Sequence, residues 1–338
     1  MNTSMNTTTT PVPTSSLQLK VQQAQMLNPL IRQLRLSAPD GGTLPGFSAG
    51  AHIKVRVQLP DGRSDERHYS LIALDARDSV SPTEYCIAVR REDAGRGGSR
   101  WMHEAVQAGD VLQVGSPRND FALQAPENGC TVLVAGGIGV TPLMSMAAQC
   151  REEGRPVRMH YAGRSRALMA YLPDLSALLG EDLLVHVDEE AGTPLDVAAL
   201  MARCGDSDRL HVCGPQVMLD AILAEAGRRG WAPDRVRFEL FAAPQVQEGD
   251  AAFEVVLASS GQRLTVGPAQ TLLEVLEEAG CDPMFDCRRG ECGVCAVPVI
   301  SGEIDHRDHV LTPREKEAGN VIQTCVSRCK GTTLVLDL

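Results

Sequence analysis

Hydrophobic and polar residues follow three different patterns along this chain. From Leu17 to about Phe121, short runs such as HIKVRVQL and RHYSLIAL alternate polar with apolar residues or are rich in β-branched ones, and Gly, Pro and Asp separate the runs. A period of two with such separators is typical of half-buried strands joined by turns. The first part of the chain therefore predicts an antiparallel barrel or sandwich.

From Thr131 the pattern changes to strands that alternate with helices. The apolar runs TVLVA, VRMHY, LLVHVD, RLHVC and VRFELF are separated by helical stretches such as TPLMSMAAQC and QVMLDAILAEAG. Alternation of this kind is typical of a parallel sheet covered by helices. The middle of the chain therefore predicts an α/β domain.

A short polar, Pro-containing segment precedes a third region with mixed strand and helix signals. Thr271 with Glu274, and Thr312 with Glu315, fit the capping-box pattern, which predicts two short helices. We expect a disordered tail at 1–16, a β-barrel at 17–126, an α/β domain at 127–242, a linker at 243–251 and an α+β domain at 252–338.

Composition narrows the class of protein. The 338 residues carry a formal net charge of −11, which gives no electrostatic basis for binding nucleic acid. The opening MNTSMNTTTTPVPTSS lacks the basic start and apolar run of a secretory signal, and no window reaches about 18 consecutive apolar residues. We expect a cytoplasmic protein with no membrane partner that acts as a monomer.

Cysteines supply the strongest chemical signal. The chain has 11, an odd number that argues against a disulfide framework in the cytoplasm. Cys287, Cys292 and Cys295 form C-x4-C-x2-C, and Cys325 follows about thirty residues later, which is the spacing of a plant-type [2Fe-2S] cluster. Gly290 would let the loop fold tightly round inorganic sulfide. A zinc site with four thiolates and unliganded core cysteines are the alternatives, and Cys281 and Cys329 are predicted not to be ligands.

Two glycine motifs predict a dinucleotide site at the carboxyl edge of the parallel sheet. After TVLVA comes GGIGVTP, where glycines permit close approach of a pyrophosphate, Thr141 is predicted to cap the next helix and Pro142 to lie in its first turn. RLHVCGPQVM repeats this strand–turn–helix order. The residues of this site are Gly136, Gly137, Gly139, Thr141, Pro142, Cys213, Gly214 and Pro215. A tight turn and a buried, unreactive Cys213 are the structural alternatives.

Arg164 and Arg166 follow the strand VRMHY, where an adenosine ribose would lie. They could bind a 2′-phosphate or simply coat the surface, so residue chemistry alone leaves NAD and NADP open.

A third constellation suits a flavin. Arg67, Tyr69 and Ser70 in RHYSL offer a cation, a ring and a hydroxyl on one strand, and GRGGS supplies Gly97, Gly98 and Ser99 before a short helix. Each motif alone fits an ordinary surface strand or loop. A nicotinamide, however, gives two electrons as hydride whereas a [2Fe-2S] cluster takes one, so a flavin is required between them.

With these three motif sets in this order, the chain resembles the phthalate dioxygenase reductase family, which includes vanillate demethylase reductases, from about Leu17 to Leu338. The resemblance implies an FMN-binding Greek-key β-barrel, an NADH-binding α/β domain and a β-grasp ferredoxin domain. It also implies a Rieske-type oxygenase as partner, acting on small, often aromatic acids.

The resemblance further implies individual roles. Contacts to FMN fall to Arg67, Tyr69, Ser70, Ala88, Arg90, Gly97, Gly98 and Ser99. Thr141 and Cys213 would lie near the nicotinamide, and Phe241, with Phe238 as the other candidate, would cover the flavin. NADH is favoured because family members use it despite an Arg-Ser pair like Arg164 and Ser165.

The implied reaction is hydride transfer from nicotinamide C4 to flavin N5, followed by single-electron steps through the cluster. The alternatives are FAD in place of FMN, NADPH in place of NADH, a haem or di-iron monooxygenase as acceptor, and a non-catalytic iron–sulfur redox sensor.

Overall fold

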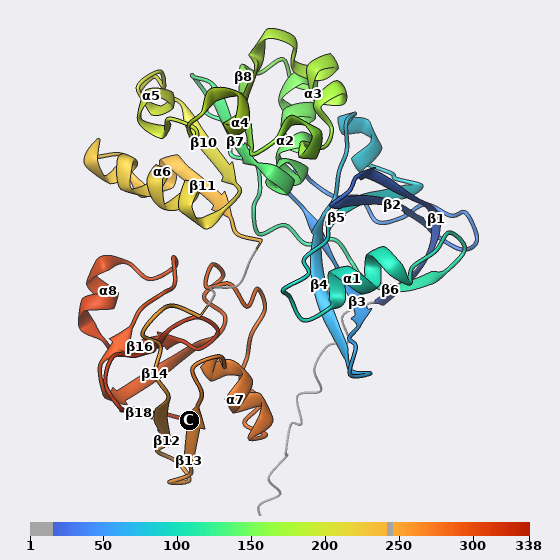
Figure 1. Ribbon diagram of the computed structural model, residues 1–338. Helices are drawn as coiled ribbons and strands as arrows, with labels where there is room; N and C mark the ends of the chain where they lie inside the picture. Colours follow the sequence, from blue (N-terminus) through green and yellow to red (C-terminus); the bar gives the residue numbers. More distant parts are fainter. Residues whose placement is uncertain (1–15, 242–245) are drawn as a thin grey trace, which may run out of the picture. The chain divides into compact units, whose positions relative to one another are not determined.

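The computed structural model describes residues 16–241 and 246–338 (Figure 1). The chain divides between Phe238 and Glu239 into two compact units. Of the predicted disordered tail, residues 1–15 lie outside the described part, and Ser16 already begins the first strand. Over the described residues, no helix is both long and apolar enough to cross a membrane.

The first unit begins with a six-stranded antiparallel sheet in the order β4-β3-β6-β1-β2-β5. The strands are β1 (Ser16–Asn28), β2 (Ile31–Ser37), β3 (His52–Gln58), β4 (Ser64–Ser70), β5 (Glu84–Arg90) and β6 (Val111–Gly115), with helix α1 (Gly98–Glu104) before β6. Alternate residues of β3, namely Ile53, Val55 and Val57, are fully buried. The edge strands β4 and β5 contact each other, so the sheet curls into a barrel, and the prediction for this part is confirmed.

A five-stranded sheet follows in the order β11-β10-β7-β8-β9. It comprises β7 (Thr131–Gly136), β8 (Val157–Gly163), β9 (Leu183–Val187), β10 (Arg209–Cys213) and β11 (Val236–Glu239). The helices are α2 (Val140–Glu152), α3 (Leu172–Leu179), α4 (Asp188–Ala191), α5 (Val197–Met201) and α6 (Gln216–Arg228). The ladders of β7 with β8 and β10, and of β8 with β9, are parallel, as predicted. Every residue of the central strand β7 is buried, which explains its continuous apolar run.

Short 3-10 turns connect several of these elements. They span Ala76–Ser79, Gly137–Gly139, Arg166–Leu168, Gly180–Asp182 and Pro233–Arg235.

The second unit is a mixed sheet with two short helices. Its strands β12 (Phe253–Leu257), β13 (Arg263–Val266), β14 (Ala296–Ser301), β16 (Val321–Gln323) and β18 (Thr333–Leu336) have the order β13-β12-β18-β14-β16, and β15 (Ile304–Asp305) pairs with β17 (Arg328–Cys329). Helices α7 (Leu272–Glu278) and α8 (Pro313–Ala318) each begin with the predicted capping box. Because β12 is parallel to β18 and antiparallel to β13, with α7 between β13 and β14 in sequence, the predicted β-grasp is confirmed.

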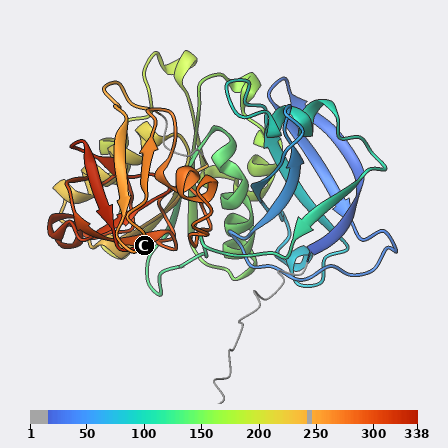
Figure 2. The same ribbon diagram turned by 90° about the horizontal axis from the view of Figure 1, so that it is seen from below.

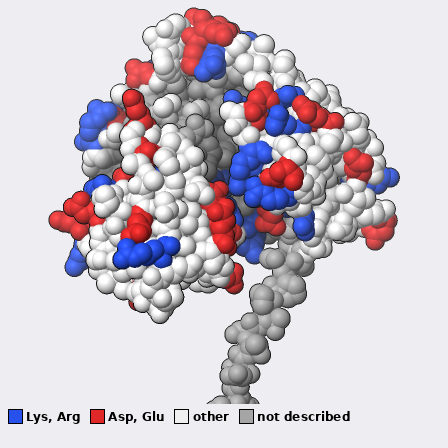
Figure 3. All heavy atoms as spheres, turned by 60° about the horizontal axis from the view of Figure 1, so that its bottom comes forward, with Lys and Arg blue, Asp and Glu red and all other residues white. Residues whose placement is uncertain are grey.

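Figure 2 shows the curvature of the blue six-stranded sheet and the helices on the green parallel sheet. On the face drawn in Figure 3, basic and acidic side chains of the described residues gather in small neighbouring groups of both signs. The predicted boundaries at 126/127, 242/243 and 251/252 stay predictions, since contacts define only the division at Phe238.

Candidate functional site

The loop between α7 and β14 carries three of the predicted cluster cysteines, and the fourth follows β16. Cys295 Sγ lies 3.2 Å from Cys325 Sγ, and both side chains are buried. Cys287 hydrogen-bonds through its thiol with Cys292 and Cys325, and the backbone N–H of Arg289 donates to Cys287 Sγ at 3.3 Å. The fold therefore brings together the four thiols that the sequence spacing singled out.

These thiols share hydrogen bonds, and their acidities diverge in consequence. Hydrogen bonds from Cys292 and Cys325 hold the pKa of Cys287 far below its ordinary value, and the hydrogen bond with Cys325 lowers the pKa of Cys295 to about 7. Hydrogen bonding to Cys287 raises the pKa of Cys292 and of Cys325. The set therefore favours thiolate at some positions, which is the form that binds iron.

The loop backbone needs left-handed conformations. Gly290 and Gly293 both have φ +77°, and a Cβ on Gly290 would lie 2.7 Å from a methyl group of Val326. Arg288 also has a positive φ, of +55°. Three thiols on a tightly folded loop, a fourth after β16 and an N–H directed at sulfur together have the donor chemistry of a [2Fe-2S] site. The four thiols hydrogen-bond to one another here. Among the described residues, no group of three or more His, Cys, Asp or Glu side chains is already arranged to hold a metal ion.

The other two cysteines near the carboxyl end lie elsewhere. Cys281 and Cys329 are half-buried and pack against the apolar core formed by the mixed sheet and α7. Their exclusion from the ligand set stays a prediction.

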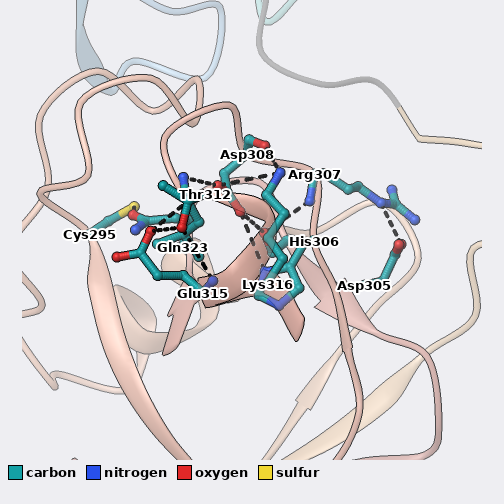
Figure 4. Close-up of polar contacts among 11 residues, drawn as sticks. Cys295, Asp305, His306, Arg307, Asp308, Thr312, Glu315, Lys316 and Gln323 are labelled. Carbon is teal, nitrogen blue, oxygen red and sulfur yellow. Dashed lines mark hydrogen bonds and ion pairs between the residues drawn. The ribbon is translucent and has the colours of Figure 1, made fainter. Parts of the chain in front are cut away.

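Polar contacts hold residues near the cluster cysteines in place, and Figure 4 shows Cys295 beside Gln323 and the contacts around Asp308. Cys295 Sγ donates to Gln323 Oε1 at 3.4 Å, and the backbone N–H of His309 donates to the carbonyl of Gly290 at 2.9 Å. The neighbouring Asp308 carboxylate is fully buried and accepts from the backbone N–H of Leu311 at 2.8 Å. Sequence reasoning missed this support, because no spacing rule links these residues to the cysteines.

Two further residues of the loop contact the segment 239–241. Arg289 Nη2 lies 3.8 Å from Glu239 Oε1, and Glu291 accepts a hydrogen bond from the backbone N–H of Leu240. Burial raises the pKa of Glu291 to about 8. Phe241, the predicted flavin cover, is 37% exposed, and its role stays a prediction.

The flavin motif RHYSL forms β4 and its end. Ser70 is buried, and its Oγ has no hydrogen-bond partner among residues 16–241 and 246–338. Arg67 donates to Asp65 Oδ2 at 2.6 Å. Burial alone would raise the pKa of Asp65, but Arg67 and Arg96 lower it. An unsatisfied buried hydroxyl is costly unless a ligand completes it, so Ser70 fits a bound polar group.

The GRGGS loop rests against the same arginine. A Cβ on Gly98 would lie 3.2 Å from Arg67 Nε, so the two flavin motifs are neighbours. Ser99 Oγ is engaged within its own loop, where it accepts from the backbone N–H of Glu92 at 3.0 Å. Arg100, which sequence reasoning missed, buries an Nε without a partner among the described residues. Two guanidinium groups beside a glycine loop suit the phosphate of a flavin nucleotide.

The remaining predicted flavin residues lie on β5. Ala88 is buried and pairs with Gln33 of β2. Arg90 is half-exposed and forms a 3.5 Å ion pair with Glu92. The roles of Ala88 and Arg90 as flavin contacts stay predictions.

The two nucleotide motifs meet at the carboxyl ends of adjacent strands, because Ala135 of β7 pairs with Cys213 of β10. A Cβ on Gly214 would lie 2.9 Å from both Cα and N of Gly136, and one on Gly139 would overlap the carbonyl of Cys213. Gly137, at φ +56°, has nothing within 4 Å of its Cβ position and faces open space. Glycine is thus required where the loops touch, and room remains beside them.

One local prediction is wrong. Thr141 does not cap α2, because Gly137–Gly139 tighten into a 3-10 turn and the helix begins at Val140 with Gly139 as its N-cap. Thr141 Oγ1 instead donates to the carbonyl of Ile138 at 3.0 Å. Pro142 lies in the first turn, as expected, and Pro215 precedes α6 as its N-cap. Thr141 and Cys213 are both almost fully buried, and their roles beside a nicotinamide stay predictions.

Beyond β8, an acidic helix lies next to the predicted arginines. Arg166 pairs with Glu190 through two hydrogen bonds of 2.8 and 2.7 Å, and Arg166 lowers the pKa of Glu190. The carbonyl of Arg164 accepts from the backbone N–H of Glu189. The carboxylates of α4 therefore already balance Arg166, a pairing that depends on the β8–β9 register and was missed from the sequence.

Comparison with known proteins supports this assembly. Residues 255–330 match the model of the 2Fe-2S iron–sulfur cluster binding domain, which favours the cluster over the zinc alternative. The chain is 40% identical over 306 residues to the toluene-4-sulfonate monooxygenase system reductase subunit of Comamonas testosteroni, covering 90% of this chain and 93% of that one. It is 38% identical to the heme-dependent oxidative N-demethylase beta subunit of Ectopseudomonas mendocina, covering 95% and 99%.

A solved structure extends the likeness to the whole fold. Phthalate dioxygenase reductase, described as a modular structure for electron transfer from pyridine nucleotides to [2Fe-2S], matches with a TM-score of 0.73 and 35% identity over 96% of this chain and 98% of that one.

Proposed function

Because the chain belongs to the phthalate dioxygenase reductase family, we propose that it carries electrons from NADH through FMN and a [2Fe-2S] cluster to a Rieske-type oxygenase. It is an oxidoreductase that combines flavin and pyridine-nucleotide chemistry with a 2Fe-2S domain and serves as the reductase of an oxygenase system. The observation that carries the finer proposal is the convergence of Cys325, which follows β16, with Cys287, Cys292 and Cys295 of the loop between α7 and β14.

The proposed roles follow from the contacts of each site. When bound, a flavin accepts hydride as an electron pair and releases electrons singly to a cluster. The buried Ser70 hydroxyl would form a hydrogen bond with the flavin. Arg67, Arg100 and the GRGGS backbone would hold the phosphate. The glycines of GGIGVTP and CGP would admit the pyrophosphate between the strand ends, and the four thiolates would ligate the irons.

Support for NADH comes from the charge around Arg166. A 2′-phosphate needs an available cation, whereas Nε and Nη2 of Arg166 both donate to the Glu190 carboxylate. The neighbouring Asp188 and Glu189 add negative charge at the same edge of the sheet. FMN in place of FAD rests on the family resemblance.

A haem protein is the second candidate acceptor. It is favoured by the 38% identity to a subunit of a heme-dependent N-demethylase, which spans 99% of that relative. A [2Fe-2S] cluster can pass electrons to either acceptor, whatever reaction the acceptor then catalyses. Assays with a Rieske-type oxygenase and with a haem protein are therefore required to identify the acceptor.

The proposal is tested on the purified protein with a matched pair of cysteine variants. Wild type should release FMN, contain iron and acid-labile sulfide, and reduce ferricyanide faster with NADH than with NADPH. Cys325→Ser should lose the labile sulfide, whereas Cys329→Ser, four residues away and packed on the core, should keep it. Absence of labile sulfide from anaerobically prepared wild type, or its equal loss in both variants, contradicts the proposed ligand set. Size-exclusion chromatography with light scattering tests the expected monomer.

A further inference from the structure

A buried serine in the nucleotide helix bonds to the end of the flavin strand. Ser145 lies in the middle of α2 and is 3% exposed. Its Oγ donates to the carbonyl oxygen of Leu71 at 2.8 Å and accepts from the backbone N–H of Ala73 at 2.9 Å. Leu71 follows β4 directly, so a single hydroxyl joins two segments more than seventy residues apart.

Ser145 is linked to two predicted site residues, Ser70 and Thr141. Ser70, whose buried hydroxyl lacks a partner within the described ranges, is the residue before Leu71. Thr141 is four residues before Ser145 and therefore one turn earlier on the same face of α2. The helix that starts at the glycine loop is thus bonded to the residues that directly follow the strand ending at Ser70.

The apolar contacts of α2 do not supply the same constraint. Barrel residues such as Ile72 and Phe121 share one apolar core with Leu143 and Met146 of α2. Apolar burial is non-directional, so such a core tolerates small slides of one element along another. A hydroxyl that donates to one backbone group and accepts from another two residues later requires a defined register.

We propose that Ser145 is a positioning residue for hydride transfer, holding the nucleotide helix in register with the flavin strand. The inference rests on the proposed function, since it presumes a nicotinamide at the GGIGVTP loop and a flavin at Ser70. Hydride transfer requires reacting atoms about 3 to 3.5 Å apart, and a misplacement of about 1 Å can cost on the order of a hundredfold in rate. A shift of α2 along the strand would act directly on that distance.

A purely structural role for Ser145 predicts a loss of stability without slower reduction of the flavin by NADH. The carbonyl of Leu71 and the N–H of Ala73 lie just beyond the β3–β4 ladder, and Ser145 completes both of them. Loss of the hydroxyl must therefore cost stability in either case. The decisive measurement is the rate of flavin reduction in protein that has remained folded and loaded.

The test is anaerobic stopped-flow reduction of the flavin by NADH in full-length Ser145→Ala. We expect unchanged visible spectra of flavin and cluster, a ten- to hundredfold slower reduction at saturating NADH, a larger effect on the limiting rate than on NADH affinity, and a weaker charge-transfer band. Reduction by dithionite, which bypasses the nicotinamide, should keep the wild-type rate. Ser145→Thr, which retains a hydroxyl, should recover most of the rate.

Ser37→Ala is the matched control, because Ser37 is also a buried serine that accepts a side-chain hydrogen bond, from Gln22 at 2.6 Å, but lies at the far end of β2. It should lose stability and keep the rate. Flavin reduction at the wild-type rate in Ser145→Ala overturns the inference, as does equal slowing in Ser37→Ala. If flavin is lost, rates are measured per bound flavin after reconstitution. A wild type that cannot oxidise NADH would instead refute the proposed function.

Discussion

The contact between the two nucleotide loops offers a sharp test of why glycine occupies them. In Gly214→Ala, the added Cβ would lie 2.9 Å from Cα and N of Gly136, whereas ordinary contacts begin at 3.4 Å. The Met218 methyl, still closer to the same Cβ position, belongs to a flexible side chain and can move, but the two Gly136 atoms belong to the backbone and cannot rotate away, so the loops must part by about 0.5 Å. Overpacking of this kind costs roughly 1 to 3 kcal/mol.

Two quantities should change together in this variant. For a unit of this size, each kcal/mol lowers the melting temperature by about 2 to 4 °C, so a loss of roughly 2 to 12 °C is expected. Since a displacement of about 1 Å can cost on the order of a hundredfold in rate, half of that should slow NADH-dependent ferricyanide reduction by roughly tenfold. Calorimetry and steady-state kinetics measure the two effects.

Gly227→Ala provides the same chemical change without the contact. Gly227 lies within α6 and has nothing within 4 Å of its Cβ position. Alanine is favoured over glycine in a helix by about 0.8 to 1 kcal/mol, so this variant should melt higher and turn over normally. Wild-type kinetics and melting in Gly214→Ala would show that the loops do not need their close approach.

Three further outcomes are expected. Cys292→Ser should abolish reduction of cytochrome c or an oxygenase while sparing ferricyanide reduction by the flavin; normal turnover with a Rieske partner would refute the electron route. Glu190→Gln should raise NADPH use relative to NADH about two- to fivefold by releasing Arg166, measured as the ratio of kcat/KM values, and an unchanged ratio would count against that pairing. Burial lowers the pKa of His211 from 6.5 to about 4, so the unfolded state binds more protons between these values and stability falls as pH falls, by up to about 3 kcal/mol. Urea titrations from pH 7 to 4 should show a shallower loss in His211→Gln, and an identical slope would contradict the assignment.

Sequence reasoning succeeded where chemistry is encoded by local spacing. The cysteines 287, 292 and 295 lie within nine residues of one another, and the capping boxes at Thr271 and Thr312 span four residues each. The strand patterns also predicted the right sheet types. Burial on one face produces alternating polar and apolar residues, and burial on both faces produces a continuous apolar run.

The missed features all depend on contacts between distant segments. Ser145 looks like any small residue of an apolar helix until Leu71 and Ala73 are placed beside it. The pairing of Arg166 with Glu190 requires β8 and β9 to be neighbours. The start of α2 was misjudged because the tight turn at Gly137–Gly139 leads directly into a helix at Val140, which places Thr141 inside the helix rather than at its cap. Register and turn geometry, rather than residue type, decide these cases.

The proposed function requires hydride transfer to the flavin and electron delivery from the cluster, and the apolar cores divide along the same line. Barrel residues Ala49 and Phe121 pack in one core with Leu133 of β7 and Val140 of α2, so the flavin and nucleotide motifs belong to a single compact unit. Hydride transfer demands this, because donor and acceptor atoms must be held within about 3.5 Å. The cluster thiols belong to the second unit, which has a core of its own around Leu276. Loosening that second core should therefore impair delivery to the acceptor before it impairs reduction of the flavin by NADH.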